Sequence, residues 1–269
     1  MSSESKKPVI LLTNDDGIDS EGLRLLRQSL ENIAELYVCA PLSERSGASH
    51  GINLKKEMLL ETRETDGRIW GYALDSTPSD CVKLALSYLQ LPRPDLVVSG
   101  INCGNNVGNS IYYSGTVGGA REAVMYGIPA IAVSMSFTSE HPPDFAASVA
   151  FTPWIVLQTL ETKLPDYAML NVNIPSVPVE EIQGIAITRQ GYSSYIDQFE
   201  KSAGASGELF CKNIGSRFLN DTGLHKTDAQ ALVANQISIS PIQLDSTHYG
   251  LLEQLESWLQ KPEFKKSVS

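Results

Sequence analysis

Long apolar runs are absent from the 269-residue sequence, and none approaches the roughly 20 residues that a membrane-spanning helix needs. The first eight residues are mostly polar and lead directly into an apolar run, so we expect neither a signal peptide nor a membrane anchor. Four cysteines are present, and none belongs to a C-x-x-C pair. We therefore expect free thiols in a reducing compartment, which favours the cytoplasm.

Positive charge is scarce. Lys and Arg number 21 against 31 Asp and Glu, which gives a net charge of −10. Because an acidic chain repels a phosphate backbone, we expect no nucleic-acid polymer as a partner. The charge does not exclude a small phosphorylated substrate, which needs only local compensation by a metal ion or by backbone N–H groups.

Several common site motifs are also missing. The sequence has no H-x-H, no H-E-x-x-H and no cysteine cluster, and its four histidines are scattered. No Walker A loop occurs, and the glycines at positions 100, 104 and 108 are spaced unlike the G-x-G-x-x-G fingerprint. A metal site would therefore be built from oxygen ligands, which suit Mg²⁺ or Mn²⁺ better than Zn²⁺.

The order of apolar runs predicts an α/β fold. Residues 9–12 and 36–40 have the composition of buried strands, and a helical pattern separates them, which is the order of a βαβ unit with parallel strands. A weak alternation over residues 53–74 suggests short strands or a hairpin. We expect further strands at residues 95–99, 131–134, 167–172, 185–188 and 237–239, and helices at 77–89, 117–126, 145–162 and 249–259.

Residues 190–230 have a different character from the rest of the chain. They are polar, contain several Gly and Ser, and show no strong period. We interpret them as an excursion from the core, either a long lobe or an arm that packs on another subunit.

Polar clusters follow three of the expected parallel strands, at residues 14–17, 43–49 and 102–109. Ligands of open α/β sheets bind outside the carboxyl ends of the strands, so we expect these clusters to converge on one site. Asp15 and Asp16 are adjacent carboxylates, which repel each other unless a cation or a shared proton intervenes. A metal ion is one interpretation; a simple turn that caps a helix is the other.

The remaining polar segments suit a phosphate group. The Asn-rich loop after residue 100 supplies side-chain carbonyls for a metal and amide N–H groups for a phosphate, although such a loop can also serve only to tolerate positive φ. Ser114, Gly115 and Thr116 precede a helix, where backbone N–H groups bind phosphate, but Ser or Thr there can equally be a plain N-cap. We interpret Arg121 and Glu122 as a structural charge pair.

Taken together, these motifs resemble the SurE survival-protein nucleotidases. The matching segments are residues 11–17, 40–41 with 45–49, 99–102 with Gly104, Asn106 and Gly108, and 113–117. Their order and spacing agree over residues 8–134, and weaker similarity continues at 188–189, 227–228 and 238–241. Four motifs in one order are more specific than any one of them.

The resemblance implies a Rossmann-like three-layer sandwich with a mostly parallel sheet. It implies a single α/β domain over residues 1–269, with a protruding oligomerisation arm at about 190–235 that is exchanged between subunits of a homodimer or homotetramer. It implies one divalent ion, Mg²⁺ or Mn²⁺, per subunit. The implied metal ligands are Asp15, Asp16, Ser46 and Asn102, and the implied substrate-binding residues are Asn14, Gly47, Asn106, Ser114, Gly115 and Thr116.

The expected activity is hydrolysis of nucleoside 5′-monophosphates, and also 3′-monophosphates, by a metal-activated water. Asp15 or Asp16 would orient or deprotonate that water. Two alternatives stay open: a nucleotide-binding regulatory protein without turnover, and a phosphatase for short polyphosphate or non-nucleotide monoesters. A haloacid-dehalogenase-type phosphatase is disfavoured, because its nucleophile requires Asp-x-Asp and here the two acids are adjacent.

Overall fold

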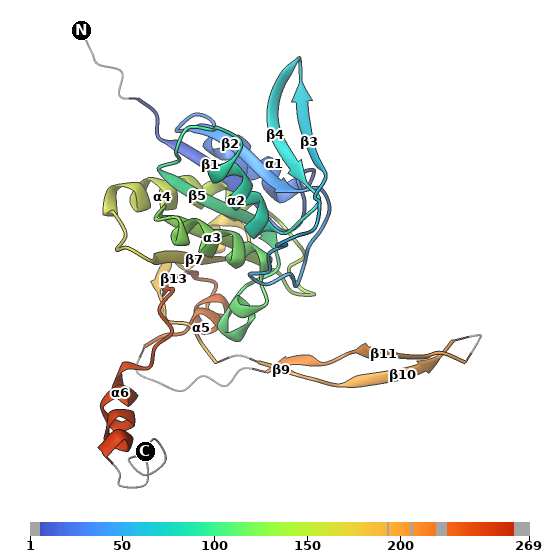
Figure 1. Cartoon of the computed structure of the whole chain (residues 1–269), viewed down its shortest axis with the longest axis vertical. Coiled ribbons are helices and arrows are strands. Elements are labelled where there is room, and N and C mark those ends of the chain that lie inside the picture. The colour runs from blue at the N-terminus through green and yellow to red at the C-terminus, as the bar shows by residue number, and fades with distance from the viewer. Residues whose placement is uncertain (1–5, 193, 205–206, 219–224, 261–269) are drawn as a thin grey trace, which may run out of the picture.

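The computed structural model describes residues 6–192, 194–204, 207–218 and 225–260. In this part of the chain, nine strands form one central sheet (Figure 1). The strands are β1 (Val9–Thr13), β2 (Glu35–Pro41), β3 (Leu60–Thr65), β4 (Arg68–Leu74), β5 (Leu96–Cys103), β6 (Ala130–Ser136), β7 (Ala168–Pro175), β8 (Ile185–Ile187) and β13 (Ile237–Gln243). Their order across the sheet is β3-β4-β2-β1-β5-β6-β7-β13-β8.

The middle of the sheet is parallel from β4 to β7. Leu12 of β1 pairs with Val38 of β2 and with Val98 of β5, so these three strands end near one another at the same edge. This confirms the predicted βαβ unit and places the polar segments after the strands on one edge of the sheet. β5 is longer than expected and carries Asn102 on the strand itself, beyond the irregular step at Gly100–Ile101.

Helices cover both faces of the sheet, which makes the predicted three layers. α1 (Glu21–Leu30) and α4 (Ala146–Thr162) pack in one apolar core with Ile10 and Leu12, whereas α2 (Pro78–Ser87) and α3 (Gly115–Met125) pack in the other with Leu11. Side chains alternate between the faces of a strand, so the continuous apolar run of β1 supplies both cores. Because β1 is packed on both faces, the position of the residues that follow it, 14–16, is fixed relative to the sheet.

Local sequence explains where the helices begin. Thr77 caps α2 by accepting from the N–H of Asp80, and Pro78 occupies the first helical position, as expected. α3 begins two residues earlier than the periodicity indicates, because Ser114 is its N-cap.

Both edges of the sheet depart from the parallel pattern. β3 pairs antiparallel with β4, which confirms the hairpin suggested for residues 53–74. At the other edge β13 runs antiparallel to β7, and β8 pairs parallel with β13. The short helix α5 (Asp228–Val233) precedes β13 and begins with a capping box formed by Thr227 and Gln230.

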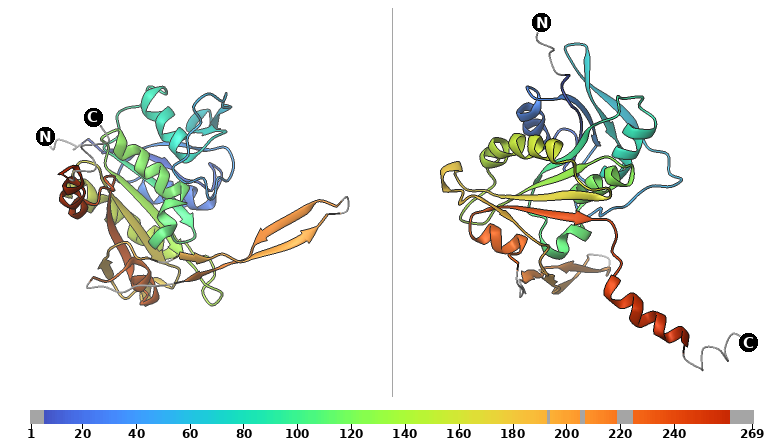
Figure 2. Two further views of the ribbon diagram at one scale, coloured as in Figure 1. Left: turned by 60° about the horizontal axis from the view of Figure 1, so that its bottom comes forward. Right: turned by 90° about the vertical axis from the view of Figure 1, so that its left-hand side faces the viewer.

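Between β8 and α5 the chain leaves the body. β9 (Ser194–Ile196) pairs with β12 (Ser216–Phe218), and β10 (Phe199–Ala203) pairs with β11 (Leu209–Asn213). This two-stranded excursion projects far from the sheet in both Figure 1 and Figure 2. Residues 193, 205–206 and 219–224 of the expected arm lie outside the described residues. The strands at 194–218 and the bridge between Arg189 and Thr227 place the root of the excursion beside the sheet.

The last described helix, α6 (Tyr249–Glu256), also stands away from the body (Figures 1 and 2). None of its residues is buried, although Leu251, Leu252 and Leu255 lie on it. Among the residues that the structure describes, no helix is both long and apolar enough to cross a membrane.

Candidate metal and phosphate site

Three segments that are distant in sequence meet at Asp15. Its backbone carbonyl accepts from the N–H of Arg45 at 2.7 Å, which ties the 43–49 loop to the end of β1. One of its carboxylate oxygens accepts from the Thr116 hydroxyl at 2.5 Å. The side chain is buried, with 4% exposure. Two of the three clusters expected to converge, residues 14–17 and 43–49, therefore meet at a buried carboxylate, and the start of α3 joins them there.

The two adjacent aspartates have raised pKa values. For Asp15, burial raises the pKa, against the opposing effect of the hydrogen bonds from Thr116 and Gly115. For Asp16, burial and then the charge of Asp15 raise the pKa to about 6. Both causes disfavour a second negative charge in the same place, and a bound cation would remove that penalty.

The donor atoms around this pair fit a hard divalent cation. The Asn14 amide oxygen is buried without a hydrogen-bond partner, while its NH₂ group donates to the Gly17 carbonyl and to Ser20. A buried amide oxygen without a partner, next in sequence to two carboxylates, is an acceptor that a cation could satisfy. No group of three or more His, Cys, Asp and Glu occurs among the described residues, so a metal here would depend on amide, hydroxyl and carboxylate oxygens.

Asn102 and Ser46 belong to the two segments that contact this pair through neighbouring residues. The N–H of Cys103, next to Asn102, donates to Asp16 at 3.4 Å, and the Asn102 amide NH₂ donates to the Gly104 carbonyl at 2.6 Å. That second bond leaves the Asn102 amide oxygen as the atom able to face a cation. Ser46 is exposed and donates to Glu44 at 2.7 Å, on the loop that Arg45 ties to Asp15. Glu44 also raises the pKa of Asp16.

Asn106 is fixed by a buried network that the sequence did not reveal. Its N–H donates to Asn173 at 2.7 Å, and its carbonyl accepts from Asn171 at 2.8 Å and Asn173 at 3.2 Å. Its side-chain NH₂ donates to Ser134 at 2.8 Å, which leaves one amide hydrogen for a ligand. The signal was the alternation of Asn171 and Asn173 on a strand otherwise made of apolar residues, which marks two polar side chains on one buried face.

The N-terminus of α3 faces the same carboxylate. Ser114 caps the helix by accepting from the N–H of Val117 at 3.1 Å, so the capping interpretation is correct, and the hydroxyl still has a hydrogen to donate. The N–H groups of Gly115 and Thr116 lower the pKa of Asp15, so the positive end of the helix is directed at the aspartate. A Cβ at Gly115 would lie 2.8 Å from the Cβ of Asp15.

The 43–51 loop is held against α3 at a second point. Ser49 donates its N–H to the Tyr113 carbonyl at 3.0 Å, and His50 bonds to the buried Glu122 at 2.7 Å. Glu122 also accepts from Lys83 at 3.1 Å. Burial alone would raise its pKa, but the bonds from His50 and Lys83 outweigh burial and lower it. The expected pairing of Glu122 with Arg121 is therefore wrong for the described residues, since the ion-pair partners of Glu122 are His50 and Lys83.

Gly47 is the expected substrate-binding residue for which the structure shows the fewest neighbours. It is exposed with φ of +75°, and a Cβ built there would meet nothing within 4 Å. Its conformation explains the glycine as a turn residue of the loop.

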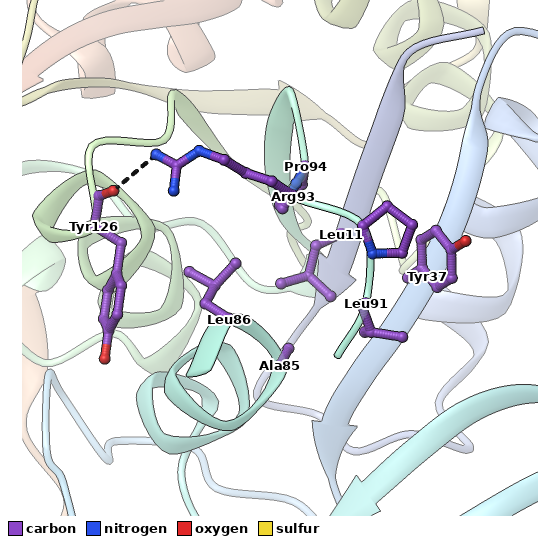
Figure 3. Close-up of a pocket in the computed structure, with 9 residues that line it drawn as sticks. Leu11, Tyr37, Ala85, Leu86, Leu91, Arg93, Pro94 and Tyr126 are labelled. Atoms are coloured by element: carbon purple, nitrogen blue, oxygen red, sulfur yellow. Dashed lines mark hydrogen bonds between the residues drawn. The ribbon is translucent and has the colours of Figure 1, made fainter. Parts of the chain in front are cut away.

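A small cavity lies at the opposite edge of the sheet (Figure 3). It has a volume of about 110 Å³, and the guanidinium of Arg93 at its wall donates to the Tyr126 carbonyl at 3.2 Å. The rest of the lining is mainly apolar, from Leu11, Tyr37, Ala85, Leu86, Leu91, Pro92, Pro94 and Tyr126. Because it contains no carboxylate, this cavity does not compete with the aspartate site as the place for metal-assisted chemistry.

These features define an α/β protein whose open parallel sheet carries a metal-competent, oxygen-lined site at the carboxyl ends of its strands. The family model described as Survival protein SurE matches residues 10–197, and the chain belongs to this family.

Relatives match along nearly the whole chain. Over 249 residues it is 38% identical to 5′-nucleotidase SurE of Syntrophobacter fumaroxidans, with 93% of this chain and 98% of that one covered. Over 253 residues it is 41% identical to 5′-nucleotidase SurE of Carboxydothermus hydrogenoformans, with 93% and 96% covered. The crystal structure of the SurE protein from Aquifex aeolicus superimposes with a TM-score of 0.80 at 35% identity, covering 94% of this chain and all of that one. The Rossmann-like α/β fold is therefore confirmed.

Proposed function

We propose that this protein is a metal-dependent 5′-nucleotidase, a phosphatase that releases phosphate from nucleoside monophosphates. The observation that carries the proposal is the pair Asp15 and Asp16, placed by β1 between the Asn102 strand end and the N-terminus of α3. The relatives named 5′-nucleotidase SurE, which align over more than nine-tenths of the chain, support the same activity.

The residues that would hold one Mg²⁺ or Mn²⁺ per chain are Asp15, Asp16, Ser46 and Asn102. When bound, such an ion lowers the pKa of a water ligand and offsets negative charge on a phosphoryl group. Thr116 fixes the orientation of Asp15 through its hydroxyl. Within the described part of the chain, Asp16 accepts only the long bond from Cys103, so it is the more available of the two carboxylates to take a proton from the attacking water.

The phosphate group would be bound by the loop and helix that surround the pair. Asn106 contributes the amide hydrogen that Ser134 does not use, and Ser114 contributes its hydroxyl hydrogen. The backbone N–H groups of Gly115 and Thr116 lie at the positive end of α3, which stabilises the charge that spreads over the phosphoryl oxygens. Gly47 would line the remaining wall of the substrate site, and the fully buried Asn14 would support it by holding the turn at Gly17 and Ser20.

We also propose that the protein forms a homodimer or homotetramer through the excursion and α6. Phe199, Leu209 and Phe210 are exposed on the hairpin, and Leu251, Leu252, Leu255 and Trp258 are exposed at the C-terminal helix. Apolar side chains on segments that stand away from the body are typical of surfaces that a second subunit covers. The four thiols are free, and this agrees with the cytoplasmic location that we propose.

Phosphate release from nucleoside 5′- and 3′-monophosphates tests the activity. The assay is run with Mg²⁺ or Mn²⁺ and again with EDTA, on the wild type and on Asp15→Ala. We expect release that EDTA and the substitution both abolish, and the panel then ranks base and phosphate position. Short polyphosphate and a non-nucleotide monoester are included as competing substrates. Tight nucleotide binding without release under any metal would favour a regulatory protein instead.

A further inference from the structure

A buried aspartate far from the metal pair holds the end of the phosphate-binding loop. Asp228 is fully buried at the start of α5. One carboxylate oxygen accepts from the N–H of Gly108 at 2.8 Å, and the other accepts from the N–H of Gly191 at 3.0 Å. Gly108 and Gly191 are 120 and 37 residues away along the chain, so these bonds join two distant segments.

Gly108 and Gly191 each lie at a junction between two segments of the chain. Gly108 closes the loop that carries Asn102 and Asn106 and begins the short 3₁₀ helix, η1 (Gly108–Tyr112), which leads to Ser114. Gly191 lies at the root of the excursion, three residues before β9. The carbonyl of Gly108 is also engaged, since it accepts from the side chain of Gln190 at 3.2 Å. The backbone of Gly108 is therefore bonded on both its N–H and its C=O to the excursion root and α5.

The loop is thus fixed at two separate points. Asn171 and Asn173 of β7 hold Asn106 from within the sheet. Asp228 and Gln190 hold Gly108 from the side of the excursion. Because the segment is bonded at both points, the relative positions of the Asn106 amide and the Ser114 hydroxyl are fixed. Binding a phosphate group in one orientation requires this.

We propose that Asp228 is a positioning residue of the phosphate site, which sets the path from Asn106 to Ser114 by holding Gly108 against the root of the excursion. The proposal rests on the nucleotidase function given above. Asp228 contacts neither substrate nor metal in this scheme, and it acts only through the loop. Its effect falls on the binding of the phosphate group, in substrate and in product alike.

The variant Asp228→Asn tests this proposal with little change of shape. One Asp228 oxygen accepts from Gly108, and the other accepts from both Gly191 and Ala229. An amide places its NH₂ group against one of these two sides, so either Gly108 or the pair Gly191 and Ala229 loses its acceptor. We expect KM for the nucleotide and the inhibition constant of inorganic phosphate to rise together by about tenfold, the scale of one lost buried hydrogen bond, while kcat falls by less than about threefold. Unchanged KM and unchanged phosphate inhibition in a folded variant would overturn the proposal, even if Tm fell.

Asp80→Asn is the matched control. Asp80 is also buried in the first turn of a helix and accepts from a backbone N–H, that of Asn53 at 3.0 Å, but it has no bond to the 102–109 loop. It is expected to lower Tm without changing KM or phosphate inhibition. If Asp228→Asn does not fold, Gln190→Ala removes the other bond to Gly108 and is expected to raise KM by about threefold. A folded Gln190→Ala variant with wild-type KM would then contradict the proposal.

Phosphate binding separates this inference from the nucleotidase assignment. The rise in Tm caused by inorganic phosphate with Mg²⁺ is measured for the wild type and for Asp228→Asn. If the wild type binds phosphate but has no turnover, the proposed function fails, and a smaller rise in the variant still supports the positioning role. If the wild type neither turns over nucleotides nor binds phosphate, both proposals fail.

Discussion

Asp15 and Asp16 show how one residue's environment follows from its neighbours in space. The sequence places two acids side by side, and the fold then removes much of their water and directs a helix N-terminus at the first of them. Thr116 and the N–H groups of the first turn of α3 stabilise the charge of Asp15, whereas the N–H of Cys103 is the one donor to Asp16 among the described residues. Ionised Asp16 is therefore the less stabilised of the two carboxylates.

This imbalance predicts a pH-dependent stability for the protein in EDTA. The folded-state pKa of Asp16 is about 6, above its ordinary 3.8, so the folded state holds the proton more tightly than the unfolded chain. The protein is therefore most stable, as far as Asp16 is concerned, when this carboxyl is protonated. Its favourable effect on the free energy of unfolding is lost as pH rises from about 4 to about 6. We expect Asp16→Asn without metal to have a Tm roughly 2–4 °C above wild type at pH 7, the shift that about 1 kcal/mol gives a protein of this size.

Differential scanning fluorimetry across pH checks this expectation. Below about pH 4 the difference between Asp16→Asn and wild type should vanish, since Asp16 is then protonated in both states. With Mg²⁺ added, the wild type should gain stability and the variant should gain less. If the variant were less stable than wild type at pH 7 in EDTA, ionised Asp16 would not destabilise the metal-free fold, and the prediction would be wrong.

Gly115 tests how closely the helix must approach the metal pair. A Cβ at this position would lie 2.8 Å from the Cβ and 2.9 Å from an oxygen of Asp15, whose side chain is buried and cannot rotate away. We expect Gly115→Ala to lower kcat/KM at least about tenfold, because the carboxylate must shift by a large part of an ångström. Gly250→Ala, where the nearest atom is a His248 side-chain carbon at 3.4 Å, should leave kcat/KM unchanged. Equal kinetics in both variants would show that Asp15 is not where the chemistry occurs.

At the scale of elements, the site depends on the close packing of the 43–51 loop against α3. Gly118 lies in the middle of α3, and a Cβ there would lie 2.4 Å from the Ser49 carbonyl oxygen. Glycine in a helix interior costs about 1 kcal/mol relative to alanine, so this residue lowers helix stability and allows close packing. The loop that carries Ser46 is held in place by that approach and by His50 with Glu122.

Gly118→Ala separates helix stability from loop position. The helix gains propensity while the loop is forced outward, so we expect Tm to change by less than about 3 °C and the Mg²⁺ concentration for half-maximal activity to rise several-fold. A metal titration of phosphate release, beside a thermal scan, measures both quantities. An unchanged metal requirement would mean that Ser46 is not needed to hold the ion.

Local sequence patterns predicted many of the helices and strands. The features that they did not predict depend on contacts between residues far apart in the sequence. Apolar runs located β1, β2, β5 and β6, and Thr77 with Pro78 located the start of α2, because such signals act over a few residues. The roles of Asn171, Asn173 and Asp228 depend on which loop lies beside them, 65 to 120 residues away in sequence. The antiparallel position of β13 between β7 and β8 had no local signal either, because register is set by the partner strands.

At the scale of the whole molecule, the sheet body is well packed while the hairpin and α6 expose apolar side chains. Phe199, Leu209 and Phe210 of the hairpin and Leu252 of α6 are among the exposed large residues, and so is Trp258 in the 3₁₀ helix η3 (Ser257–Gln260) that follows α6. If copies of this chain associate as proposed, contacts of this kind would have to outweigh the repulsion between chains of net charge −10.

The double variant Leu252→Lys with Leu255→Lys tests whether α6 is an interface. Charges placed on its apolar face should shift the protein toward the 29.3 kDa monomer in sedimentation, because a lysine side chain would have to lose its water to enter the contact. Val233→Lys on α5, where the side chain is 77% exposed, is the control and should leave the assembly unchanged. A wild type that already sediments as a monomer would rule out the interface.

The bridge between Arg189 and Thr227 has a consequence for how this chain can vary. The excursion leaves and re-enters the body at adjacent points, so the strands on either side stay paired whatever lies between them. Segments with neighbouring ends can be lengthened, shortened or exchanged at little cost to the rest of the fold. The excursion is thus a replaceable insert: a new recognition element could be grafted at residues 194–218, with the 190–191 and 227–228 joints retained to keep Gly108 in place.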